Sequence, residues 1–123
     1  AETKFTSVPC VHLDSFLSSH DYDFIFMDIE GSETHAMQGM TSILQNAKTL
    51  VAEFIPHHLR NVADVSIKDF LHPLANFRTM IVPSLKRCFY DTEIEQVLSL
   101  MLDKNVADPG LIFHKPRINV NWN

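Results

Sequence analysis

Residues 23–35 place a run of apolar side chains directly before a group of acidic ones, and this order constrains the fold most. Residues 24–27 are all apolar, which is the pattern of a strand covered on both faces of a sheet. Three carboxylates then follow, interrupted by a glycine: Asp28, Glu30, Gly31 and Glu33. Crowded carboxylates repel one another, so their position directly after a strand indicates a site.

A second strand is predicted over residues 49–56, where Pro56 stops it, after a first strand over residues 22–29. Residues 32–46 carry apolar side chains at helical spacing and predict a helix between the two strands. Such a unit connects parallel neighbouring strands through a right-handed crossover. Because ligands bind beyond the carboxyl ends of such strands, we expect Asp28 and Glu53 to meet at one rim.

Shorter elements make up the rest of the chain. Residues 4–13 are β-like, and a short helix is expected to start at Asp14 or Ser15. Residues 66–69 resemble a capping box that opens a helix, which Pro73 should kink or end. Further expected elements are a strand over 78–82, a helix from Thr92, a turn at 108–110, a last strand over 111–114 and a loosely held tail over 117–123.

The composition fits one ordinary globular α/β domain over residues 1–123, because 46% of the residues are hydrophobic and 20% are charged. The net charge of −5 argues against nucleic-acid binding, which depends on lysine and arginine. No apolar stretch approaches the roughly 20 residues that span a bilayer. Cys10 and Cys88 show no CxxC spacing, which favours free thiols and a cytoplasmic protein over a disulfide.

Four pieces of residues 8–56 carry a resemblance to a known family. They are Leu13-Asp14, the run Asp28-Ile-Glu30-Gly31-Ser-Glu33, Gly39 in the following helix, and the strand that ends in Glu53. In this order they resemble the FkbM family of S-adenosylmethionine-dependent methyltransferases. The resemblance implies a partial Rossmann-like class I methyltransferase sheet, with three layers, mostly parallel strands and an antiparallel last strand.

The resemblance also marks a departure from the family pattern. Class I methyltransferases bind their cofactor with a glycine-rich loop, but Gly31, Gly39 and Gly110 form no Gly-x-Gly turn. The matched elements correspond to the fourth to seventh strands of that fold. We therefore expect the C-terminal half of a methyltransferase, favoured over a diverged protein that kept half of the fold. S-adenosylmethionine should serve the full-length parent, with weak or no binding by these 123 residues.

The resemblance implies roles for the side chains of the rim. Asp28, Glu30 and His57 are catalytic candidates that would steer or deprotonate a small-molecule hydroxyl, plausibly of a sugar or natural product. Asp28 is also a cofactor-binding candidate. The candidates for substrate binding are Glu33, His35, Glu53 and His58.

Other readings of these residues stay open. Glu33 is better explained as an acceptor of backbone N–H groups at the start of a helix. The pair His57 and His58 is equally typical of a solvated loop. Several of these side chains are of metal-ligating types, but their spacing matches no metal motif, so no metal is expected.

A second hypothesis belongs to another functional class. Without a front half, the strand that begins at Phe24 becomes the edge of the sheet. An exposed apolar edge strand tends to pair with another chain. The chain would then be a catalytically silent α/β assembly module that forms a homodimer.

Overall fold

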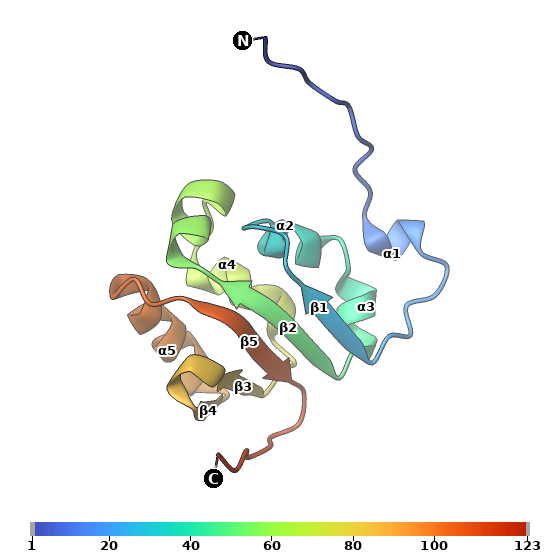
Figure 1. Ribbon diagram of the computed structural model, residues 1–123. Coiled ribbons are helices and arrows are strands. Elements are labelled where there is room, and N and C mark those ends of the chain that lie inside the picture. The colour runs from blue at the N-terminus through green and yellow to red at the C-terminus, as the bar shows by residue number, and fades with distance from the viewer. Residues whose placement is uncertain (1, 123) are drawn as a thin grey trace.

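A computed structural model, which describes residues 2–122, shows a five-stranded mixed sheet with helices packed against it (Figure 1). The strands are β1 (Phe24–Met27), β2 (Thr49–Phe54), β3 (Thr79–Val82), β4 (Arg87–Tyr90) and β5 (Asp108–His114). Their order across the sheet is β1-β2-β5-β3-β4. The predicted strand–helix–strand unit is confirmed, because β1 and β2 are parallel neighbours.

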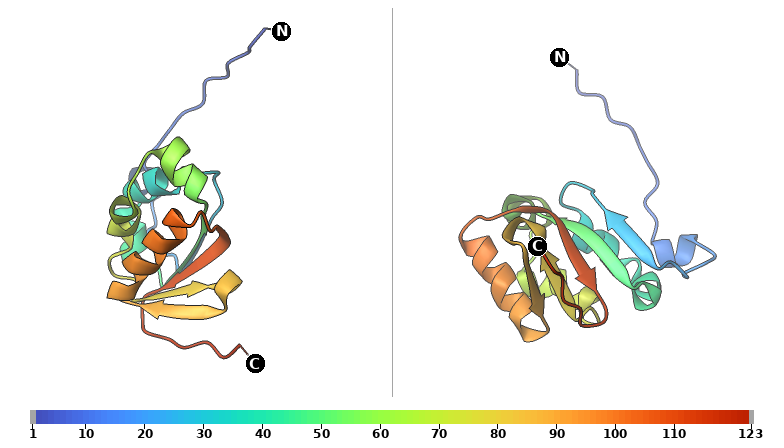
Figure 2. Two further views of the ribbon diagram at one scale, coloured as in Figure 1. Left: turned by 90° about the vertical axis from the view of Figure 1, so that its left-hand side faces the viewer. Right: turned by 60° about the horizontal axis from the view of Figure 1, so that its bottom comes forward.

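The α-helices lie together on one side of the sheet (Figure 2). They are α1 (Leu13–Phe16), α2 (Glu33–Gln38), α3 (Thr41–Asn46), α4 (Ile67–Leu71) and α5 (Thr92–Asp103). Shorter turns are the π-helix η1 (His58–Ala63) and the 3₁₀ helices η2 (His72–Leu74) and η3 (Pro83–Leu85). No helix among the described residues is long and apolar enough to cross a membrane.

The core lies between these helices and one face of the sheet. Leu50, Ala52 and Phe54 of β2 are fully buried, whereas the alternate residues of that strand are only half-buried. This alternation follows from the pleat, which sends successive side chains to opposite faces. Burial of each large apolar side chain contributes about 1.5–3 kcal/mol, so this face stabilises the domain.

The expectation of a mostly parallel, three-layer sheet is wrong in its details. Only β1 and β2 pair in parallel, and the other three pairings are antiparallel. One cause is the hairpin of β3 and β4, which sequence reasoning missed because Lys86, with a φ of 51°, takes the place of a turn glycine. The antiparallel last strand is confirmed, since β5 inserts between β2 and β3.

Strand β1 forms an edge of the sheet, as predicted, but it is not covered on both faces. Phe24 is 59% exposed and Phe26 is 65% exposed, while Met27 points into the core. A continuous apolar run cannot reveal that only one of its faces packs against helices. The described chain therefore has an open apolar face beside its edge strand.

The single helix expected over residues 32–46 is divided in two at Gly39. A Cβ at Gly39 would lie 3.3 Å from the Cα of His12. The Asp14 N–H also donates to the Gly39 carbonyl over 3.0 Å. Gly39 thus permits close approach of the segment around α1.

Asp14 explains part of the sequence pattern near the N-terminus. Its carboxylate accepts hydrogen bonds from the backbone N–H groups of Ser42, over 2.8 Å, and Ile43, over 3.2 Å. These N–H groups belong to the first turn of α3 and have no partner within that helix. A side chain from a distant segment therefore caps α3 and attaches α1 to the domain.

Elements outside the β1–β2 unit agree with the sequence in part. The capping box of Ser66 and Asp69 is confirmed, and α4 ends two residues before Pro73. Residues 4–12 form no strand, and β5 begins at Asp108, inside the expected turn. In the tail, the Ile118 N–H donates to the Thr79 hydroxyl over 3.1 Å. Both cysteines are free thiols.

Replacement of the Asp14 carboxylate tests its capping role. We expect Asp14→Ala to lower the free energy of unfolding by about 1–2 kcal/mol, because two N–H groups of α3 lose their acceptor. Urea unfolding followed by circular dichroism measures the change. Asp21→Ala, which removes an exposed carboxylate, should change stability by less than about 0.5 kcal/mol. Equal effects of the two variants would contradict the capping role.

The capping box should also contribute to the pH dependence of stability. The backbone N–H and hydroxyl of Ser66 donate to Asp69 and hold the pKa of its carboxyl below the ordinary value. A lowered folded-state pKa stabilises the protein above the unfolded-state pKa, and this contribution disappears as the pH falls through the folded-state pKa. We expect Asp69→Asn to flatten the stability curve below about pH 4, as measured by urea unfolding at stepped pH. A curve parallel to that of the wild type would contradict this linkage.

Candidate functional site

The parallel pairing of β1 and β2 sets the geometry of the rim. Met27 lies opposite Ala52 at the end of the shared register, so Asp28 and Glu53 follow at the same edge. The expectation that these two carboxylates share one rim is confirmed. The pairing of β2 with β5 is irregular between Ala52 and Phe54, and Glu53 lies at that irregularity. A bulge of this kind turns a side chain out of the regular ladder.

The turn after β1 has an unusual backbone that brings Glu30 toward η1. Glu30 has a φ of 55° and Gly31 a φ of 101°, both in the left-handed region. A Cβ at Gly31 would lie 3.0 Å from the Cβ of His58 and 2.9 Å from a methyl group of Val62. Glycine is therefore required here for its conformation and for close contact with η1.

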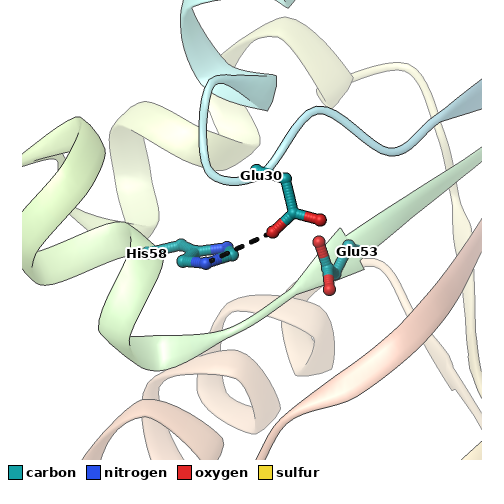
Figure 3. Close-up of side chains that lie close together, drawn as sticks. All are labelled: Glu30, Glu53 and His58. Atoms are coloured by element: carbon teal, nitrogen blue, oxygen red, sulfur yellow. Dashed lines mark ion pairs between the residues drawn. The ribbon is translucent and has the colours of Figure 1, made fainter.

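Glu30, Glu53 and His58 converge from three different segments (Figure 3). One side-chain ligand atom of each residue lies within 4.8 Å of those of the other two. The Nε2 of His58 lies 3.9 Å from a carboxylate oxygen of Glu30. The side chain of Glu30 is 79% exposed, whereas that of His58 is 18% exposed. The group therefore combines one exposed side chain, Glu30, with two half-buried ones, Glu53 and His58.

Glu53 has the most perturbed environment of the three. Burial raises the pKa of the Glu53 carboxyl, and the negative charges of Glu30 and Asp28 raise it further. His58 acts in the opposite direction, and Glu33 adds a smaller upward effect. Its Oε2 atom is buried and is without a hydrogen-bond partner among the described residues. Such an atom normally finds a donor or a cation.

The remaining acidic candidates have different surroundings. Glu33 is buried, and its carboxylate accepts the N–H of Ile29 over 3.2 Å. This bond closes the turn before α2 and confirms the backbone reading of Glu33. Asp28 is exposed and influences Glu53 through its charge. It lies on the rim but outside the group of three.

The neighbouring histidines His57 and His58 contact different partners, a difference that the sequence does not reveal. His57 is exposed, and the Asn61 amide donates to its Nδ1 over 2.9 Å. His58, the next residue, faces Glu30 instead. His35 is exposed on α2 and lies outside the group. Adjacent histidines at the start of a helical turn diverge by about 100°, but which of them faces the rim depends on how η1 packs.

A mostly apolar hollow lies elsewhere in the molecule. It measures about 400 Å³ and is bordered by α4, η2 and the start of α5, with Lys68, His72, Phe77, Ile94 and Glu95 among its lining residues. Its exposed lining is mostly apolar, and it holds none of the groups of three converging His, Cys, Asp or Glu side chains found among the described residues. The chemistry of the described chain is therefore concentrated at the rim, not in this hollow.

Comparison with known proteins identifies the family of the chain. The family model of the methyltransferase FkbM domain matches residues 2–103. Searches among curated proteins and among solved structures found no match. The family match includes the strand–helix–strand unit, the turn at Gly31 and all three residues of the group. This protein belongs to the FkbM methyltransferase family.

Proposed function

We propose that this chain provides the acceptor-binding rim of an S-adenosylmethionine-dependent O-methyltransferase, with a sugar or natural-product hydroxyl as the acceptor. The observation that carries the proposal is the convergence of Glu30, Glu53 and His58 at the carboxyl ends of two parallel strands. In α/β sheets this is where ligands bind. Membership of the FkbM family supports methyl transfer as the reaction.

The described residues do not by themselves fit S-adenosylmethionine. Gly31 serves the turn toward η1, Gly39 the contact with His12, and Gly110 lies in β5. The described chain thus has no glycine-rich turn through which a backbone could approach the cofactor. The family implies this methyl donor in general, and Asp28 is the residue of the rim proposed to face it.

The residues of the rim suit the handling of a hydroxyl group. A carboxylate oxygen accepts a hydrogen bond from the hydroxyl and fixes the direction of its lone pairs. Glu30 is accessible enough to make this contact, and the Nε2 of His58 lies 3.9 Å from its carboxylate. The proton released when the oxygen gains a methyl group passes to the carboxylate of Glu30. His57 is proposed as a secondary contact at the outer edge.

Acceptor binding gives a direct test. Saturation-transfer NMR with a panel of sugars and polyketide alcohols, in the presence of a chelator, should identify hydroxyl compounds that bind the wild-type chain. We expect Glu30→Gln to weaken binding of such a compound about tenfold, because a charge-assisted hydrogen bond becomes a neutral one. Glu95→Gln on α5 makes the same chemical change at an exposed site away from the rim and should have no effect. Equal affinities of the wild type and Glu30→Gln would contradict the proposal.

A second candidate function, assembly through the sheet edge, is favoured by the exposure of β1. Pairing of β1 with its copy across a two-fold axis is antiparallel. A register centred on Ile25 places Phe24 opposite Phe26 of the partner subunit, on the open face. This contact would cover aromatic surface that is 59% and 65% exposed in one copy. We propose this homodimer as the catalytically silent alternative, since it requires no acceptor.

Sedimentation equilibrium tests the homodimer. We expect the wild type to associate in the micromolar range and Phe26→Lys to shift the dimer dissociation constant upward at least tenfold, because two charges would then oppose the contact. Leu100→Lys is the matched control, since Leu100 is 54% exposed on α5, which packs against β4 at the opposite edge of the sheet. A wild-type monomer at all concentrations would contradict the dimer.

A further inference from the structure

We propose that Glu30, Glu53 and His58 form a binding site for a divalent transition-metal ion of the Mn²⁺ or Zn²⁺ class. The site goes beyond the proposed methyl transfer and does not depend on it. Two carboxylates and one imidazole offer three ligand atoms, which all lie within 4.8 Å of one another. The three residues come from the turn after β1, from β2 and from η1.

The separation of the ligand atoms suits a small ion after a modest contraction. Metal–ligand distances of about 2.0–2.2 Å place neighbouring ligand atoms roughly 3–3.5 Å apart. The His58 Nε2 and the Glu30 carboxylate are already 3.9 Å apart. The highly exposed side chain of Glu30 can supply the remaining movement by rotation, because nothing packs over most of its surface.

An independent observation at Glu53 favours a bound ligand. Its Oε2 atom is buried and lacks a hydrogen-bond partner among residues 2–122. A buried carboxylate oxygen without a donor is costly, so folded proteins rarely leave one in that state. A bound cation would satisfy this oxygen directly. The convergence of the ligand atoms and the unpaired oxygen are separate facts about the same carboxylate group.

The negative charge around the cluster also favours binding of a cation. Asp28 and Glu33 add negative charge that raises the pKa of Glu53, and among the described residues His58 acts on it in the opposite direction. The other ion pairs among the described residues involve Lys48, Arg78 and Arg117, and their acidic partners are Asp23 and Asp91. No lysine or arginine of the described chain pairs with the rim. A divalent ion would offset the repulsion between its carboxylates.

The types of ligand atom select the class of metal. Magnesium and calcium prefer sites made of oxygen ligands alone, whereas imidazole suits zinc and other first-row transition metals. No cysteine belongs to the cluster, which disfavours copper(I) and iron–sulfur centres. Three protein ligands leave coordination positions open, as in catalytic zinc sites. These positions would be available to water or to an oxygen of a small molecule.

Calorimetric titration of the chelator-treated chain with MnCl₂ or ZnCl₂ tests the site. We expect one equivalent of metal to bind the wild type, and Glu53→Gln and His58→Gln each to weaken binding at least tenfold, because each variant loses a ligand. Asp28→Asn is the matched control, since it removes a nearby charge that is outside the ligand set. It should weaken binding less than threefold. Acceptor binding measured with a chelator present separates this test from that of the proposed function.

A second measurement on the wild type guards against variants that fail to fold. Substoichiometric Mn²⁺ should broaden the NMR signals of Glu30, Glu53 and His58 before those of other residues. An absence of saturable binding by the folded chain would overturn the proposal. Equal losses of metal affinity in Asp28→Asn and Glu53→Gln would also overturn it, because they would indicate a diffuse counterion atmosphere. Broadening of NMR signals centred on another acidic region would overturn it as well.

Discussion

The parallel register of β1 and β2 is the constraint on which the rim depends. Phe24 lies opposite Thr49 and Met27 opposite Ala52, so the two strands end together. A slip of one residue in β2 would send Glu53 to the helix-covered face, where Ala52 and Phe54 are fully buried. Burial of Leu50 and Phe54 therefore fixes the position of a carboxylate that contributes nothing to the core. The packing of one face determines the chemistry of the other.

The turn at Glu30 adds a local cost that the surrounding packing offsets. A non-glycine residue in the left-handed region costs on the order of 1–3 kcal/mol. Glu30 adopts this conformation with a φ of 55°, directly before Gly31 in the same region. The close contact of Gly31 with His58 and Val62 holds the turn against η1. The same contact brings His58 beside Glu30, so the backbone conformation and the cluster of side chains have one cause.

The sequence predicts the central unit well because its signals are local. The apolar runs, the helical spacing between them and the stop at Pro56 indicate two parallel strands, and the rim follows from that topology. The capping box at Ser66 is equally local. The β3–β4 hairpin is not predicted because Lys86 occupies a left-handed turn position that usually takes glycine or asparagine. The break at Gly39 depends on His12, a contact between distant segments.

The group of three residues could be predicted only in part. Glu30 and Glu53 follow from the strand ends, but the choice of His58 over His57 depends on the packing of η1. The burial of Oε2 of Glu53 depends on long-range contacts and has no sequence signal. The open face beside β1 has no sequence signal either, because Phe24 and Phe26 would be equally typical of a strand covered on both faces. Residue types indicate which groups can take part, and tertiary packing decides which of them meet.

The open face and the acidic rim are linked by the pleat of the two strands. In register, Phe24 and Phe26 share their face with Val51, and Asp28 and Glu53 continue that face to the rim. A surface that covers the two phenylalanines and extends to the rim would also remove water from the neighbourhood of Glu53. Desolvation already disfavours the charged form of this carboxyl, and further covering would increase that cost. Occupancy of the apolar face and neutralisation of the rim, by a proton or a cation, should therefore be coupled.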